Sequence, residues 1–159
     1  MADVPMLHEW LQRPHVAEWW TPTPSLEEVV EDFAPLTRPG YREQGYIAFE
    51  GDRAIGYIQS YVVKGSGDGW WEGEQDPGAL GIDQFLSNGD QLGRGLGTTM
   101  LRAFVERLFD DPAVTHIQTD PNPRNARAIR CYEKAGFRAV NEVDTPDGPA
   151  LLMICRRLR

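Results

Sequence analysis

The sequence predicts a mixed α/β fold (α+β) with a largely antiparallel central sheet flanked by helices. Three observations support this class. Segments rich in strand-forming residues flank a turn dipeptide at Gly51-Asp52, a glycine-rich segment leads directly into an amphipathic helix, and strands and helices follow one another without strict βαβ alternation. With 159 residues, of which 41% are hydrophobic, the chain can bury a substantial core. We therefore expect one domain over residues 1–159.

The first half of the chain is expected to form helices and then a hairpin. Residues 4–10 have a helical pattern, and aromatic residues crowd a short element over residues 15–20. Ser25 is suited to cap a helix that continues to about residue 36. Strands are expected over residues 46–50 and 54–63, on either side of the Gly51-Asp52 turn.

The second half is expected to begin with a loop over residues 65–81, and loops of this length in compact domains are usually functional. A short strand over 82–86 and a helix over 98–109 follow, the helix ending before Pro112. Asn125 is placed to cap a second helix, and Gly136 to stop it. The remaining strands are expected over residues 114–119, 137–143 and 150–156, with a turn over 145–148 between the last two.

The charge of the chain favours a cationic ligand over nucleic acid. The formal net charge is −8, whereas binding to phosphate backbones needs a basic surface. No basic residue occurs between Lys64 and Arg94, an interval that holds Asp68, Glu72, Glu74, Asp76, Asp83 and Asp90. An ordinary solvated acidic surface would explain the charges alone. Because Trp70 and Trp71 lie among these acids, we favour a binding site.

Several classes of protein are not expected from this sequence. The first residues lack the basic and apolar regions of a signal peptide, and no apolar run approaches the roughly 20 residues of a membrane span. A cytoplasmic protein with no membrane partner is the prediction. Cys131 and Cys155 both lie in segments expected to be regular, which favours buried thiols. His8, His15 and His116 are scattered, so no metal site is expected.

The segment Gln91-Leu-Gly-Arg-Gly-Leu-Gly-Thr98 has the features of a phosphate-binding loop. Its alternate glycines leave no Cβ between backbone N–H groups and an anion, and the helix that follows adds the positive end of its dipole. The spacing matches neither a P-loop nor a Rossmann loop. From these residues alone, a plain tight turn remains an equal alternative.

The order of the elements, with Asn125-Ala-Arg-Ala-Ile-Arg-Cys-Tyr-Glu-Lys-Ala-Gly-Phe137 after the glycine segment, resembles the GNAT superfamily of acyl-CoA-dependent N-acetyltransferases. Within that superfamily the chain is similar to aminoglycoside 6′-N-acetyltransferases over nearly its whole length. The motifs that carry this similarity are Glu18-Trp-Trp20, Gly65-Ser-Gly-Asp-Gly-Trp-Trp71, Gly81-Ile-Asp-Gln84, Gln118-Thr-Asp-Pro121 and Thr145-Pro-Asp-Gly-Pro149.

The resemblance implies acetyl-CoA as co-substrate, with its pyrophosphate on the glycine loop. The residues expected to bind it are Gln84, Phe85, Leu86, Gln91, Leu92, Gly93, Arg94, Gly95, Leu96, Gly97, Thr98 and Asn125. The family usually has Gln or Arg where this chain has Leu92. Backbone N–H groups, helped by Arg94, are therefore expected to make the phosphate contact.

The resemblance also implies roles in catalysis. Asp83 matches the family's proposed base, and a role as a substrate anchor, with water relaying the proton, stays open. Tyr132 is expected to protonate the leaving thiolate, although its helix face would also suit a core position. A polycationic sugar needs several carboxylates and an apolar wall. The expected substrate residues are Trp20, Asp68, Trp70, Trp71, Asp83, Asp120 and Asp147.

The predicted function is acetyl transfer to the 6′-amino group of aminoglycoside antibiotics. One alternative is an N-acyltransferase that acts on a lysine-type amine in siderophore synthesis. Another is a module that binds CoA or drug without turnover. We expect a monomer or weak dimer, with a cationic small molecule as partner and no nucleic acid.

Overall fold

The computed structural model describes residues 2–20 and 22–158, which form two compact units. The first unit comprises Met1–Ser60 and Asp83–Leu92, and the second comprises Tyr61–Ile82 and Gly93–Arg159. Two of the three chain crossings between the units fall inside strands, one between Ser60 and Tyr61 and one between Ile82 and Asp83.

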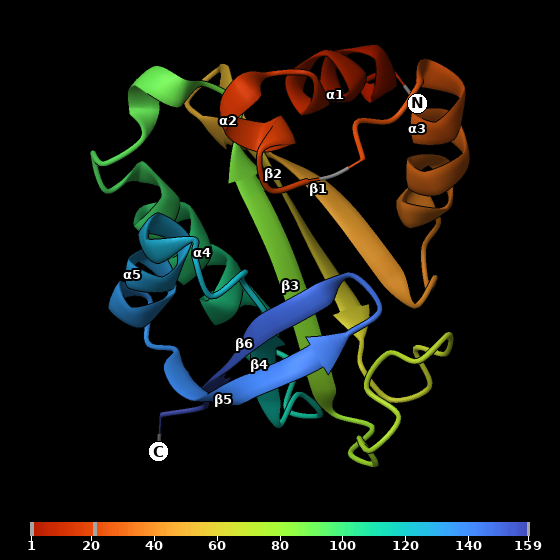
Figure 1. The fold of residues 1–159 in the computed structure, drawn as a ribbon, viewed down its shortest axis with the longest axis vertical. Helices are drawn as coiled ribbons and strands as arrows, with labels where there is room; N and C mark the ends of the chain where they lie inside the picture. Colours follow the sequence, from red (N-terminus) through yellow and green to blue (C-terminus); the bar gives the residue numbers. More distant parts are fainter. Residues whose placement is uncertain (1, 21, 159) are drawn as a thin grey trace. The chain divides into compact units, whose positions relative to one another are not determined.

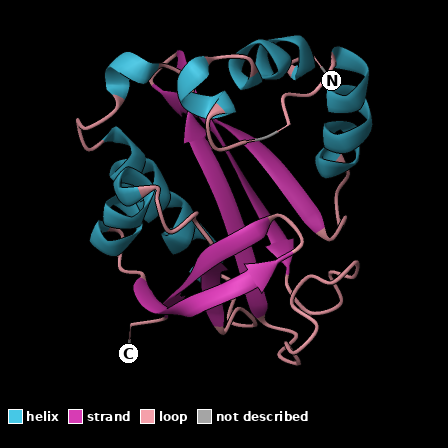
Figure 2. Ribbon diagram, in the orientation of Figure 1, coloured by secondary structure: helices cyan, strands magenta, loops and turns pink. Residues whose placement is uncertain are grey.

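Six strands form one mixed sheet with the order β1-β2-β3-β4-β6-β5. They span β1 (Glu43–Glu50), β2 (Arg53–Val62), β3 (Ala79–Leu86), β4 (His116–Thr119), β5 (Arg138–Thr145) and β6 (Gly148–Arg156). β3 pairs with β4 in parallel, whereas β6 pairs antiparallel with both β4 and β5. Figure 2 shows these strands with the helices beside them. The predicted fold class is thus confirmed.

Most helical elements of the first unit precede its strands. They are α1 (Val4–Leu11), α2 (Pro14–Ala17), α3 (Leu26–Phe33) and the 3₁₀ turn η1 (Ala34–Thr37), whereas the 3₁₀ turn η2 (Gly89–Gln91) follows β3. Ser25 caps α3 as predicted, because its hydroxyl accepts from the Glu28 N–H at 3.2 Å while the Glu28 carboxylate accepts from the Ser25 N–H at 2.6 Å. This reciprocal pair satisfies two N–H groups at the start of the helix.

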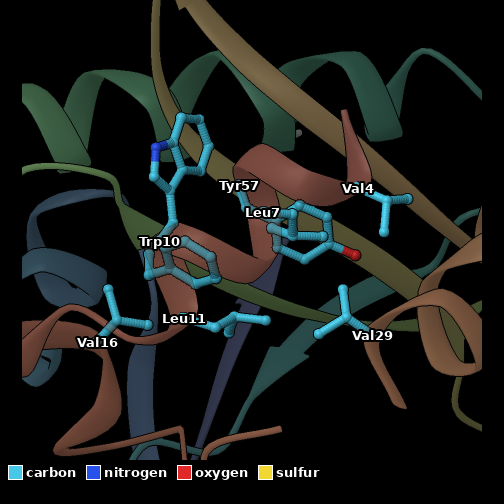
Figure 3. Close-up of a cluster of buried hydrophobic side chains, with 8 residues drawn as sticks. Val4, Leu7, Trp10, Leu11, Val16, Val29 and Tyr57 are labelled. Carbon is cyan, nitrogen blue, oxygen red and sulfur yellow. The ribbon is translucent and has the colours of Figure 1, made fainter. Parts of the chain in front are cut away.

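The core of the first unit gathers apolar side chains of α1 and α2 around the strands. Figure 3 shows seven of its members labelled, including Trp10 from α1 and Tyr57 from β2. Phe85 from β3 belongs to the same cluster, and its ring meets the Trp10 ring edge-on at 6.4 Å. The end of β3 that carries Phe85 is therefore packed into the main core of this unit.

The second unit contains α4 (Leu96–Phe109) and α5 (Ala126–Lys134), which lie side by side in Figure 1. Asn125 caps α5 as predicted, since its Oδ1 accepts from the Ala128 N–H at 3.2 Å. Gly136 follows the helix with φ +103°, a conformation that glycine adopts readily, so the predicted stop is confirmed.

Strand boundaries differ from the predicted ones. β3 begins at Ala79 rather than at residue 82, because the Ala79 carbonyl already accepts from the Val63 N–H at 3.1 Å. The predicted long loop is shortened by the same residues. Pairing with neighbouring strands sets these ends, and the local sequence alone does not reveal such pairing.

In the parts of the chain that the structure describes, no helix is long and apolar enough to cross a membrane.

Candidate active site

Asp83 lies half-buried on β3 and takes part in a short chain of hydrogen bonds. Its Oδ2 accepts from the Gln59 amide Nε2 at 3.1 Å, and the Gln59 Oε1 accepts from the Tyr57 hydroxyl at 2.7 Å. Tyr57 is only 3% exposed. Burial, followed by the negative charges of Asp83 and Glu43, raises the pKa of Tyr57 well above its usual value. The phenol therefore stays protonated as a donor.

Trp20 lies in the same unit and packs edge-on against two aromatic rings. Its centroid is 5.0 Å from that of Phe85 and 6.2 Å from that of Tyr57. The side chain is only partly buried. Trp20 thus packs against the core of the first unit while the residue stays partly accessible.

The end of β3 is fixed by two side chains that enter from the segment around α2. His15 Nε2 contacts the Leu86 carbonyl at 2.7 Å, and an Arg13 Nη1 donates to the Ser87 carbonyl. The Ser87 N–H donates to the Ile55 carbonyl of β2 at 2.8 Å. The backbone just beyond residues 84–86 is therefore held from both sides.

Two glutamine side chains of the first unit have buried oxygens without a hydrogen-bond partner, Gln84 Oε1 and Gln91 Oε1. Buried acceptors without partners are rare, and such groups are often met by a ligand or water. Both residues are among those expected to bind CoA. Leu92, which follows Gln91 directly after η2, is half-buried.

The glycine loop has the backbone that its sequence predicted. Gly93 and Gly95 adopt left-handed conformations with φ of +77° and +80°, and a Cβ built on either would meet nothing within 4 Å. Gly95 directly precedes α4, and Arg94 between the glycines is exposed. The open backbone before a helix start is suited to an anion.

The first residues of α4, which follow this loop, have no exposed polar side chain up to Thr98. Leu96 and Gly97 are half-buried. Thr98 is buried, and its hydroxyl lies 3.5 Å from the Cys131 Sγ of α5. The Thr98 hydroxyl is thus engaged with α5, and the exposed groups of the loop suited to an anion are its backbone N–H groups.

The loop before β3 in the second unit, residues 65–78 and here named the acidic loop, has a constrained backbone. Asp68 and Trp71 are the non-glycine residues with positive φ in the described part of the chain, at +53° and +49°. The Trp70 and Trp71 rings lie 6.0 Å apart, and Gly67 pairs with Trp70 in an isolated bridge. Backbone strain of this kind clusters at functional sites.

The acidic loop lies beside the β5–β6 turn. A Cβ built on Gly69 would lie 3.5 Å from the Cγ of Pro146. Asp147 follows Pro146 in that turn, and both Asp68 and Asp147 are exposed. The structure thus brings two predicted substrate carboxylates into neighbouring segments, together with the tryptophan pair.

His116 anchors the base of this loop, a role that the sequence analysis missed. Its Nε2 lies 3.6 Å from a Glu74 oxygen and its Nδ1 lies 3.7 Å from an Asp76 oxygen. The Thr115 hydroxyl donates to Asp76 at 2.7 Å. Within the described residues, no group of three or more His, Cys, Asp or Glu side chains could hold a metal ion.

Tyr132 is 4% exposed on α5, and its ring meets that of Phe137 edge-on at 5.4 Å. This placement has the core character considered as its alternative role. Asp120 follows β4 and is half-buried, and the next residue, Pro121, accepts from the Leu151 N–H at 2.8 Å. Asn125 uses its side-chain oxygen to cap α5.

The predicted site residues divide between the two units. The first unit holds Trp20, Asp83, Gln84, Phe85, Leu86, Gln91 and Leu92, and the second holds Asp68, Trp70, Trp71, Gly93, Arg94, Gly95, Leu96, Gly97, Thr98, Asp120, Asn125, Tyr132 and Asp147. Sequence reasoning missed Tyr57 and Gln59. Their spacing of two within a predicted strand, which places both side chains on one face, was the available signal.

Residues 1–145 match the family model described as an acetyltransferase (GNAT) domain. The chain therefore belongs to the GNAT family of acetyltransferases. It is 56% identical over 158 residues to aminoglycoside N(6′)-acetyltransferase type 1 of Klebsiella pneumoniae, an alignment that covers 98% of this chain and 79% of that protein.

The structure is also similar to a crystal structure of aminoglycoside acetyltransferase AAC(6′)-Ib in complex with coenzyme A and kanamycin. The TM-score is 0.93 at 56% identity, over 98% of this chain and 90% of that one. A more distant relative is the lysine N-acyltransferase MbtK of Mycobacterium tuberculosis, 28% identical over 156 residues, with 91% of this chain and 69% of that protein covered.

Proposed function

We propose that this chain transfers the acetyl group of acetyl-CoA directly to the 6′-amino group of aminoglycoside antibiotics. The observation that carries the proposal is 56% identity, over 98% of the chain, to a relative named for that reaction. The similar structure that holds coenzyme A and kanamycin supports both substrates. The net charge of −8 suits a polycationic acceptor.

The acceptor ammonium must lose a proton before its nitrogen can attack the thioester. Asp83 is the proposed group for this task. A carboxylate is a weak base toward an ammonium group, so the main contribution proposed for Asp83 is to bind and orient the amine while water relays the proton. The hydrogen bond from Gln59 leaves the carboxylate its charge, which this role requires.

The thioester carbonyl becomes an oxyanion in the tetrahedral intermediate, and backbone N–H groups from residues 84–86 are the proposed donors. The contacts of His15 with the Leu86 carbonyl and of Arg13 with the Ser87 carbonyl support a fixed backbone at this end of β3. Tyr132 is proposed to protonate the leaving CoA thiolate, since a phenol with a pKa of about 10 can donate to it.

The glycine loop is proposed to hold the CoA pyrophosphate. This assignment is supported by the open left-handed backbone at Gly93 and Gly95 and by the exposed Arg94 between them. The remaining residues proposed for CoA are Gln84, Phe85, Leu86, Gln91, Leu92, Leu96, Gly97, Thr98 and Asn125. The oxygens of Gln84 and Gln91 that lack partners support this assignment.

Carboxylates and tryptophans are proposed to bind the drug. Asp68, Asp120 and Asp147 would meet its amino and hydroxyl groups, and Trp20, Trp70 and Trp71 would form an apolar wall for the sugar rings. The proximity of the acidic loop to the β5–β6 turn supports the pairing of Asp68 with Asp147. The chain is proposed to act in the cytoplasm as a monomer or weak dimer.

Acyl transfer to a lysine-type amine is the second candidate, favoured by the 28% identity to a lysine N-acyltransferase. A long acyl donor would need an apolar tunnel, so a series of acyl-CoA chain lengths separates the two reactions. Activity that peaks with acetyl-CoA supports the aminoglycoside enzyme. Calorimetric binding of drug or CoA without any product would instead indicate a module that only binds.

The main test measures release of CoA thiol with kanamycin or tobramycin as acceptor. Turnover that requires a 6′-amino group is expected, and absence of turnover with every 6′-amino drug would overturn the proposal. Asp83→Asn should lose most of kcat while still binding acetyl-CoA. Asp52→Asn, an exposed change of the same kind in the β1–β2 turn, is the matched control and should leave kcat unchanged.

A further inference from the structure

We propose that Gln59 is a positioning residue for Asp83 and that Tyr57 holds the Gln59 amide in its working orientation. The inference rests on the proposed role of Asp83 in acetyl transfer. Three side chains in the first unit form the chain: Tyr57 donates to Gln59 at 2.7 Å, and Gln59 donates to Asp83 at 3.1 Å. All three lie on adjacent strands, β2 and β3.

The direction of the chain follows from its two ends. The Asp83 carboxylate can only accept, so the Gln59 group that faces it must be the NH₂. The reverse orientation would bring the Gln59 oxygen against a carboxylate oxygen with no proton between them. With the NH₂ facing Asp83, the Gln59 oxygen faces Tyr57, and the phenol must donate to it.

Tyr57 is suited to this task because it can neither ionise nor move easily. Its ring is 97% shielded and meets Phe33 edge-on at 5.3 Å and Phe85 at 5.6 Å. Gly45 on β1 leaves room for the hydroxyl, since a Cβ built there would lie 2.6 Å from the phenol oxygen. The donor thus has one position, and it fixes the amide that follows.

A neutral donor has a specific advantage at Asp83. An arginine or lysine in the place of Gln59 would hold the carboxylate equally well but would neutralise it and compete with the cationic acceptor. The amide restricts the rotamer of Asp83 and leaves its charge for the incoming ammonium. The negative charges of Asp83 and Glu43 act on the Tyr57 phenol in addition to burial and keep it protonated as a donor.

The test compares Gln59→Leu, Tyr57→Phe and the double variant in steady-state assays with kanamycin and acetyl-CoA. Gln59→Leu should lower kcat by about tenfold or more, the scale of one hydrogen bond to a charged group, and leave the KM for acetyl-CoA within about twofold. Tyr57→Phe should have a smaller effect. The double variant should be no slower than Gln59→Leu, because both changes interrupt one chain.

Gln44→Leu is the matched control, since Gln44 is a half-buried glutamine of the same unit whose amide donates to the backbone carbonyls of Arg38, Tyr41 and Glu43. It should keep kcat. Unchanged kcat in Gln59→Leu, or multiplying losses in the double variant, would overturn the inference. Adding Gln59→Leu to Asp83→Asn should cost nothing further.

Wild-type turnover tests the proposed function separately. The hydrogen bonds are also observable without turnover, because the side-chain NH₂ of Gln59 gives its own signals in ¹⁵N-edited NMR spectra. Those signals should shift in both Asp83→Asn and Tyr57→Phe and stay unchanged in Gln44→Leu. If the Gln59 NH₂ signals do not shift in Asp83→Asn, the proposed chain of hydrogen bonds is refuted, even if the protein proves inactive toward aminoglycosides.

Discussion

Gly45→Ala tests how closely β1 approaches the Tyr57 phenol. The added methyl would lie 2.6 Å from the hydroxyl oxygen and 3.2 and 3.3 Å from the two nearest ring carbons, whereas ordinary contacts begin near 3.4 Å. Tyr57 cannot retreat, because its ring packs against Trp20, Phe33 and Phe85. Overpacking of a rigid core costs about 1–3 kcal/mol. For a chain of this size each kcal/mol lowers Tm by about 2–4 °C, so a fall of about 2–12 °C is expected.

The assay is thermal unfolding followed by circular dichroism. Gly73→Ala is the control, because a Cβ at Gly73 meets nothing within 4 Å and its φ is not positive. Gly45→Ala combined with Tyr57→Phe should recover part of the loss, since the shortest contact disappears while the ring contacts stay. An unchanged Tm in Gly45→Ala, or no recovery in the combination, would refute the reasoning.

Three further predictions concern stability. Ser25→Ala should cost about 1 kcal/mol, measured by urea unfolding, because the α3 cap is lost, and a Ser25→Asn variant should retain most of it. Hydrogen bonds from the Thr115 hydroxyl and then from the Gly78 N–H lower the pKa of Asp76 below its usual value. The ionised carboxylate therefore stabilises the folded chain above a pH of about 4, and this stabilisation is lost as the pH falls through the lowered pKa. Asp76→Ala should therefore lower Tm at pH 7 and not at the acid end of the profile, and an equal fall at both would contradict the assignment. If residues 1–159 form a single domain, calorimetry should show one unfolding transition, because the chain crosses three times between the two units and neither is a continuous segment. Two separate transitions would contradict the single-domain prediction.

Local signals in the sequence were sufficient where one residue decides the geometry. Ser25 and Asn125 cap their helices, and Gly136 stops α5, because each role depends on a side chain or a φ angle within one turn. The glycine loop likewise has the predicted left-handed backbone at Gly93 and Gly95. Fold class followed from the order of such local elements.

Contacts between distant segments were not accessible in the same way. His15 meets Leu86 and His116 meets Glu74 only because the fold brings these segments together, so both histidines had no companions in the sequence. Gln59 carries no motif and is recognisable only through its partners, Tyr57 and Asp83. The resemblance to the GNAT superfamily predicted which residues form the site, whereas the hydrogen bonds from Tyr57 to Gln59 and from Gln59 to Asp83 became visible only in the structure.

Both cysteines of the chain are free, and burial raises the pKa of each thiol. The thiolate is the nucleophile that attacks a thiol-reactive dye, so the folded protein should react slowly with the reagent that measures released CoA. Single-turnover experiments, in which enzyme and product are present in equal amounts, can therefore be followed with such a dye. The same reagent reports unfolding, because denaturation should expose two thiols per chain.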